Sequence, residues 1–196
     1  RRSVELEARS RIRALQARIR PHFLFNSMNT IASLTRSDPA RAEEAIEDLS
    51  DLFRISLSEA RAQITLREEL EVARIYQRIE QLRLGDRLQV RWKVADLPAE
   101  AIVPSLLLQP LLENAIGHGI EPLPEGGTVM IEGHAEGGVA TIEVSNPVSA
   151  TARAVRAGNR MALDNIRQRL DLAFPGRASV EVDESSTTYR VRIRFP

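Results

Sequence analysis

The hydrophobic period of the chain changes at Gly85, and this change constrains the fold more than any other feature. Before Gly85, apolar residues recur every three or four positions, as they do along one face of a helix. After Gly85, Leu88, Val90, Trp92 and Val94 alternate with polar residues, as they do in a half-buried strand. The order of the two periods predicts an α+β chain with a helical first part.

The change of period predicts two domains, a helical region at residues 1–84 and a second domain at residues 85–196. In the first, the start signal Ser37-Asp38-Pro39 separates two amphipathic helices, which we expect to pack as an antiparallel hairpin. A third helix follows the capping-box sequence Thr65-Leu66-Arg67-Glu68 and ends at Gly85.

The second domain alternates predicted strands with a few helices. We expect strands from Leu88 and at 128–135, 139–144, 179–182 and 189–195, with helices at 102–116 and 161–174. Pro110 lies inside the first of these helices and predicts a kink there. Strands with their helices on one side predict a two-layer α/β sandwich.

The first helix carries a spacing typical of a coiled coil. The 3-4-3-4-3 positions are Ile12, Leu15, Ile19, His22, Asn26 and Asn29. This spacing favours a homodimer through the N-terminal helices with His22 near the shared axis. A surface helix with its histidine in a polar patch explains the same spacing equally well.

Composition excludes some classes of function. Lys plus Arg and Asp plus Glu both number 27, so no overall field attracts nucleic acid, and we expect no nucleic-acid partner. The chain has no cysteine, which excludes disulfides and thiolate metal sites. The longest apolar run, 101–112, is interrupted by polar residues and prolines and is too short to span a bilayer.

Two motifs carry the candidate chemistry. In the first, Pro21 disfavours a continuous helix, and His22 and Asn26 stand one turn apart on one helix face. A neutral imidazole is nucleophilic near pH 7 and can accept a phosphoryl group, while the amide can orient the ring or hold a water. The second motif places Glu113 and Asn114 on a helix whose opposite face is rich in leucine.

The stretch 19–31 resembles the phosphoacceptor region of the LytS-like bacterial sensor histidine kinases, and 108–119 resembles the asparagine box of their ATP-binding domain. The resemblance covers roughly the whole chain. It implies a Bergerat (GHKL ATPase) fold for the second domain, the cofactors ATP and Mg²⁺, and a response regulator as partner. It also implies a missing N-terminal membrane sensor, so that this chain is the cytoplasmic portion of an inner-membrane protein. The paired Arg1 and Arg2 fit that position.

By this resemblance, His22 is the phosphoacceptor, and Asn26 and Glu113 are further catalytic residues. Asn114 is the magnesium ligand, since a carboxamide oxygen is a hard ligand. The candidate nucleotide-binding residues also include His118, Gly119, Asn146, Gly158 and Asn165.

Two nucleotide-binding boxes depart from the family pattern. Asn146 stands where the family has an aspartate that binds adenine, so the charge assistance of that hydrogen bond is lost. Pro147 and Val148 follow it in place of a flexible glycine segment, and Arg160 interrupts the glycine-rich lid.

The leading prediction is a kinase core that autophosphorylates on His22 from Mg-ATP and passes the phosphoryl group to a response regulator aspartate. The alternative is a catalytically impaired scaffold that binds and controls its regulator without ATP turnover.

Overall fold

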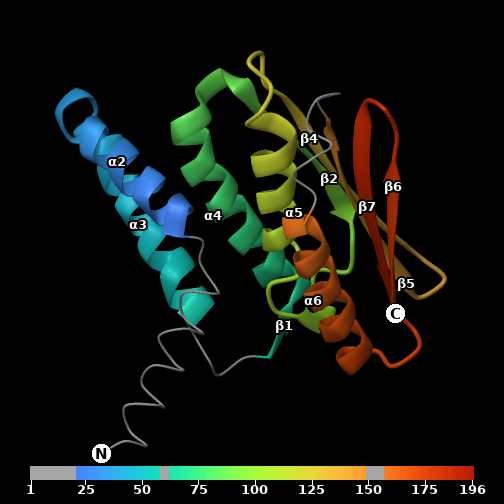
Figure 1. The fold of residues 1–196 in the computed structure, drawn as a ribbon. Helices are drawn as coiled ribbons and strands as arrows, with labels where there is room; N and C mark the ends of the chain where they lie inside the picture. Colours follow the sequence, from blue (N-terminus) through green and yellow to red (C-terminus); the bar gives the residue numbers. More distant parts are fainter. Residues whose placement is uncertain (1–20, 58–61, 149–156) are drawn as a thin grey trace, which may run out of the picture.

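The computed structural model describes residues 21–57, 62–148 and 157–196. Within these ranges a five-stranded sheet is covered on one face by helices α4, α5 and α6, and a helical hairpin packs outside α4 (Figure 1). This α+β arrangement, with an antiparallel helical hairpin followed by a two-layer sandwich, confirms the predicted fold class.

The hairpin consists of α2 (Pro21–Ser37) and α3 (Pro39–Leu57). Asp38 separates the two helices, and its Oδ1 accepts a hydrogen bond from the backbone N–H of Arg41 at 3.2 Å, as an N-cap does. The upstream seam positions Ile12, Leu15 and Ile19 lie outside the described residues.

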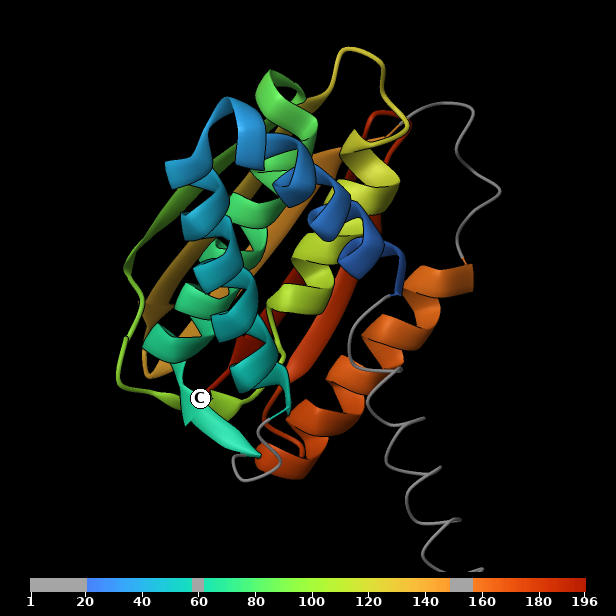
Figure 2. The same cartoon turned by 90° about the vertical axis from the view of Figure 1, so that its left-hand side faces the viewer.

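Helix α4 (Leu66–Leu84) lies between the hairpin and the rest of the structure (Figure 2). Its capping box is formed as predicted: the Thr65 side chain accepts from the Glu68 N–H, and Glu68 accepts from the Thr65 N–H at 2.8 Å. The helix ends at Gly85, whose φ of 56° favours glycine. Because α4 contacts both the hairpin and the sheet side, the domain boundary after residue 84 stays a prediction.

The large sheet has the order β2-β4-β5-β7-β6. Its strands are β2 (Leu88–Asp96), β4 (Gly127–Glu136), β5 (Val139–Pro147), β6 (Ser179–Glu184) and β7 (Thr188–Phe195). Strands β2 and β4 pair in parallel, and the other neighbours are antiparallel. A short 3₁₀ turn, η1 (Gly85–Arg87), leads into β2. The predicted strands are confirmed, and Gly137 and Gly138 form the turn between β4 and β5 with positive φ.

The predicted helix 102–116 is wrong in its first half. Ile102–Pro104 forms strand β3, which pairs antiparallel with β1 (Gln63–Thr65). Residue Leu106 has a φ of 59°, which no continuous α-helix permits. Helix α5 therefore begins only at Gln109, and Pro110 lies in its first turn, where its missing N–H requires no kink.

Helix α5 (Gln109–Asn114) continues directly as a π-helical segment, η2 (Ala115–Ile120). The helix therefore extends beyond its predicted end at residue 116, and His118 and Gly119 are helical. Helix α6 (Ala157–Ala173) packs beside α5 and covers the sheet near β6. In the part of the chain that the structure describes, no helix combines the length and hydropathy needed to cross a membrane.

Candidate functional site

His22 is exposed in the first turn of α2, and Asn26 lies against it one turn later. The Asn26 Nδ2 atom is 3.3 Å from both His22 Nδ1 and His22 Nε2. A position equally far from both nitrogens lies over the ring face, because an in-plane position at that distance would overlap ring carbons. The amide of Asn26 therefore supports the exposed ring of His22.

Aromatic packing holds the His22 segment on α4. The ring of Phe23, 8% exposed, stacks on Tyr76 with 4.9 Å between centroids and 29° between planes. The buried Ser27 hydroxyl donates to the Phe23 carbonyl at 2.7 Å. Arg78 of α4 binds the Asp48 carboxylate of α3 through two nitrogens at 2.7 and 2.8 Å, so both hairpin helices are tied to α4.

An ion network on α4 lies between the hairpin and the η2 segment. Arg83 contacts the buried Glu80 at 2.5 Å and Glu121, which follows η2, at 2.6 Å. Burial raises the pKa of Glu80, and the hydrogen bond from Arg83 opposes that rise. Sequence analysis missed this network. The available signal was a glutamate on the buried face of a predicted helix with an arginine three residues later.

A second buried carboxylate positions the start of α5. Glu69 of α4 accepts backbone hydrogen bonds from Leu106 at 3.0 Å, Leu107 at 2.5 Å and Leu108 at 2.7 Å. Burial raises the pKa of Glu69, and these hydrogen bonds oppose that rise. Sequence analysis also missed Glu69, which fixes the segment leading into the Asn114 helix.

Asn114 itself is 5% exposed at the end of α5. One turn earlier, Gln109 Nε2 donates to Glu113 Oε1 at 2.9 Å, while the buried Gln109 Oε1 has no hydrogen-bond partner among the described residues. The structure thus brings Glu113 and Asn114 together with an orphaned amide oxygen.

Gly119 and Asn146, far apart in the sequence, are in contact. A Cβ atom at Gly119 would overlap the Asn146 amide, so glycine is required where η2 approaches β5. Asn146 is 5% exposed, and its Nδ2 donates to the Pro147 carbonyl at 2.8 Å. Its amide oxygen remains the group available to accept from a base.

The other predicted nucleotide-binding residues are less closely grouped. His118 is half-buried in η2, Gly158 lies in the first turn of α6, and Asn165 is exposed on α6. No recorded hydrogen bond joins Asn165 to the other candidates in the described ranges. The lid stretch between β5 and α6 includes residues 149–156, which lie outside those ranges.

The residues present fit Mg-ATP in part. Amide oxygens are hard ligands of the kind that magnesium accepts, and the orphaned Gln109 oxygen is one such ligand on the same helix as Asn114. The space beside the Gly119 backbone is filled by the Asn146 amide, which offers no charge to a base. Among the described residues, no cluster of three His, Cys, Asp or Glu side chains is arranged to hold a metal.

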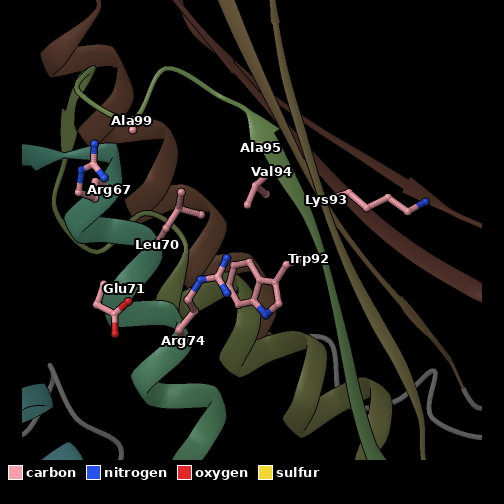
Figure 3. A pocket seen from close by; sticks show the side chains of 9 residues that line it. All are labelled: Arg67, Leu70, Glu71, Arg74, Trp92, Lys93, Val94, Ala95 and Ala99. Carbon is pink, nitrogen blue, oxygen red and sulfur yellow. The ribbon is translucent and has the colours of Figure 1, made fainter.

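A separate groove of about 430 Å³ lies between α4 and β2 (Figure 3). Trp92 lines it, as does Arg74, whose guanidinium is 4.6 Å from the indole ring centroid. The Trp92 Nε1 donates to Gln77 Oε1 at 2.7 Å. Trp92 is thus half-buried on the helix-facing side of the sheet, as the alternating pattern after Gly85 predicts.

Comparison with known proteins identifies the class of this chain. Residues 10–88 match the histidine kinase family model. This range includes the His22 motif and α4. The class is therefore that of histidine kinases.

Curated relatives narrow this class. The chain is 31% identical to sensor histidine kinase BtsS of Escherichia coli K12 over 188 residues, which are 95% of this chain and 33% of BtsS. It is 35% identical over 179 residues to YpdA of the same strain, covering 87% and 32% of the two chains. It is 32% identical over 197 residues to the sensor protein LytS of Staphylococcus saprophyticus, covering 94% and 33%. The chain belongs to the LytS-like sensor histidine kinases, and it spans about a third of the length of these relatives.

The catalytic domain of histidine kinase ThkA aligns with a TM-score of 0.49 at 11% identity, covering 68% of this chain and 93% of that domain. A score this low supports no conclusion. The two motifs also suggest a narrower assignment, to the alginate and fimbrial regulator sensors of this group, and these comparisons do not show it.

Proposed function

We propose that this chain is the cytoplasmic kinase core of a two-component sensor, which autophosphorylates on His22 from Mg-ATP and passes the phosphoryl group to an aspartate of a response regulator. The observation that carries the proposal is an exposed His22 within a histidine kinase match, on a helix whose Phe23 stacks on Tyr76 of α4. The sensor histidine kinase relatives support the two-component setting.

In this proposal the residues divide into two groups. His22 supplies the nucleophilic nitrogen, and Asn26 supports the ring so that a nitrogen edge faces the reactant. Asn114 holds magnesium, Glu113 orients the reacting groups, and His118 and Gly119 border the nucleotide. The bound Mg-ATP supplies the γ-phosphoryl group. Asn146 accepts a hydrogen bond from the adenine amino group. Gly158 and Asn165 contact the nucleotide from the glycine-rich lid.

The exposed face of the hairpin supports a homodimer. Phe25 and Met28 of α2 are 67% and 58% exposed, and Ile46 of α3 is 51% exposed. Large apolar side chains gathered on two paired helices favour burial against a second copy, which would complete a helical bundle. We assign the chain to the cytoplasmic side of an inner membrane. In this proposal the membrane sensor belongs to the rest of a longer protein, of which the chain spans about a third as it does of its relatives, and the response regulator is a separate protein.

A scaffold without ATP turnover is the second candidate, and the uncharged side chain of Asn146 favours it. A hydrogen bond from the adenine amino group to the Asn146 amide oxygen lacks the strength of one to a carboxylate. Such a chain would bind and control its regulator through the same fold.

Labelling with ATP separates the two candidates. The purified chain is incubated with Mg²⁺ and γ-labelled ATP beside the variants His22→Gln and His134→Gln. His134 is a matched control because it is also exposed, on β4. Acid-labile label that disappears only in His22→Gln supports the kinase, whereas label that persists in this variant shows that His22 is not the acceptor.

Calorimetry with nucleotide tests the scaffold directly. No label and no nucleotide binding by the unmodified chain would support the scaffold. In either case, Asn146→Asp should tighten nucleotide binding by roughly tenfold, because it restores a charged acceptor worth about 1.5 kcal/mol or more. An unchanged affinity would show that this position does not limit binding.

A further inference from the structure

The groove between α4 and β2 is lined by none of the residues assigned to the proposed kinase reaction (Figure 3). Its volume of about 430 Å³ lies in the lower part of the ~300–1,000 Å³ range of small-molecule sites. One wall is a face of α4 that carries Leu70 and Arg74, and these side chains point toward Trp92 and Val94 of β2. The groove thus combines an aromatic ring, apolar side chains and a cation.

Hydrogen bonds hold the two walls of the groove in place. The Trp92 Nε1 donates to Gln77 Oε1 of α4 at 2.7 Å, which restrains the indole ring. Nearer the start of α4, the backbone N–H of Arg67 donates to the Ala99 carbonyl at 2.9 Å and joins the helix to the segment after β2. The walls are therefore formed in advance, and a ligand that enters loses little affinity to ordering of the protein.

Arg74 supplies the charge that is available in this groove. Its guanidinium lies 4.6 Å from the centroid of the indole ring, within the range of a cation–π contact. The other three charged residues of the lining are each paired with a side chain of opposite charge: Arg67 with Glu100 at 2.5 Å, Lys93 with Glu132 at 2.9 Å, and Glu71 with Arg78 at 3.6 Å. Figure 3 also shows that Lys93 points away from the groove. Arg74 has no carboxylate partner among the described residues, so its N–H donors are available to a ligand.

The charges of the lining limit the kind of ligand. A cation is disfavoured, because Arg74 already lies over the indole ring and would repel it. A phosphate with two negative charges is also disfavoured, because Glu71 is part of the lining and Arg74 is its single unpaired cation in the described ranges. A ligand with one negative charge and an apolar body matches both the cation and the apolar walls.

We propose that this groove binds a small aromatic carboxylate. The two carboxylate oxygens match the planar guanidinium of Arg74, and charge-assisted bonds of this kind are roughly twice as strong as neutral ones. The flat ring packs beside the Trp92 indole and against Leu70 and Val94, where it removes apolar surface from water. The inference does not depend on the proposed kinase function, because the two sites share no residue.

The first test uses the unmodified chain and three probes. Trp92 is the only tryptophan, so its indole N–H gives a single ¹H–¹⁵N NMR signal that reports on this groove. Cinnamate should shift this signal to saturation, with a Kd at least about tenfold lower than that of the neutral cinnamamide or the aliphatic hexanoate. An indole signal that cinnamate does not shift, or an equal Kd for cinnamamide, would overturn the inference. An equal Kd for hexanoate would refute the need for a ring.

The second test compares Arg74→Gln with Arg91→Gln. Arg91 precedes Trp92 on β2 and is exposed on the opposite side of the strand, so it controls for the loss of one positive charge near the indole. We expect Arg74→Gln to raise the Kd for cinnamate by roughly tenfold and to leave that for cinnamamide unchanged. Arg91→Gln should bind both probes as the unmodified chain does. Equal cinnamate affinity in the two variants, or equal weakening of both probes by Arg74→Gln, would refute the role given to the guanidinium.

Discussion

Replacement of Glu69 by glutamine should destabilise the chain strongly, although Glu69 belongs to no predicted motif. Glu69 Oε1 accepts from Leu107 and Leu108, and Oε2 accepts from Leu106. In Glu69→Gln the amide oxygen can keep the first two bonds, but the amide nitrogen then faces the Leu106 N–H, donor against donor. A lost hydrogen bond costs about 0.5–1.5 kcal/mol and a buried unsatisfied donor about 1–3 kcal/mol.

The sum predicts a loss of about 1.5–4.5 kcal/mol, a large part of the ~5–15 kcal/mol by which a domain is stable. The assay is urea unfolding followed by circular dichroism, with Glu71→Gln as the exposed control on the same helix. The control should stay within about 0.5 kcal/mol of the unmodified chain. A Glu69→Gln variant as stable as this control would refute the reasoning.

The pH dependence of the same comparison has a definite sign. Burial raises the pKa of Glu69 above its ordinary value of 4.5, so the folded chain holds this proton more tightly than the unfolded chain. The stabilising contribution of Glu69 is therefore fully present below pH 4.5 and decreases as the pH rises through the raised pKa. The free-energy difference between the unmodified chain and Glu69→Gln should narrow over that range. A difference that widens with pH would contradict the assigned direction.

Three further predictions concern packing. Phe25→Glu should shift the chain toward monomer in analytical ultracentrifugation, whereas Leu172→Glu, at a 78% exposed site on α6, should not; equal behaviour would exclude the Phe25 face as the dimer contact. Gly119→Ala should weaken nucleotide binding in calorimetry by roughly tenfold or more and cost about 1–3 kcal/mol of stability, since its Cβ overlaps Asn146. Pairing it with Asn146→Ala should recover the stability, and no recovery would place the clash elsewhere. Phe23→Ala should cost about 3–5 kcal/mol in thermal unfolding through loss of the buried stack; a cost under 1 kcal/mol would show that α2 is not docked on α4 in solution.

Local patterns were sufficient for most elements of this fold. The Thr65 capping box, the Asp38 start signal and the glycine turn after Glu136 each involve residues within a few positions of one another. Such interactions depend little on the rest of the chain, so a single sequence predicts them well. The stretch 102–108 failed for the opposite reason. Its apolar run suits a helix, but pairing with β1 and the hydrogen bonds to Glu69 impose a strand and a left-handed residue instead.

The sequence by itself determined the order of most helices and strands and contains the His22 and Asn114 motifs, because periodicity and local turn chemistry specify these features. Only the tertiary structure decided that Gly119 meets Asn146 and that Arg83 links the buried Glu80 of α4 to Glu121 after η2. The bonds between Glu69 and residues 106–108 span 37 to 39 positions. Contacts of this kind exist only after the intervening elements have packed, since burial first brings these groups together and then makes their pairing necessary.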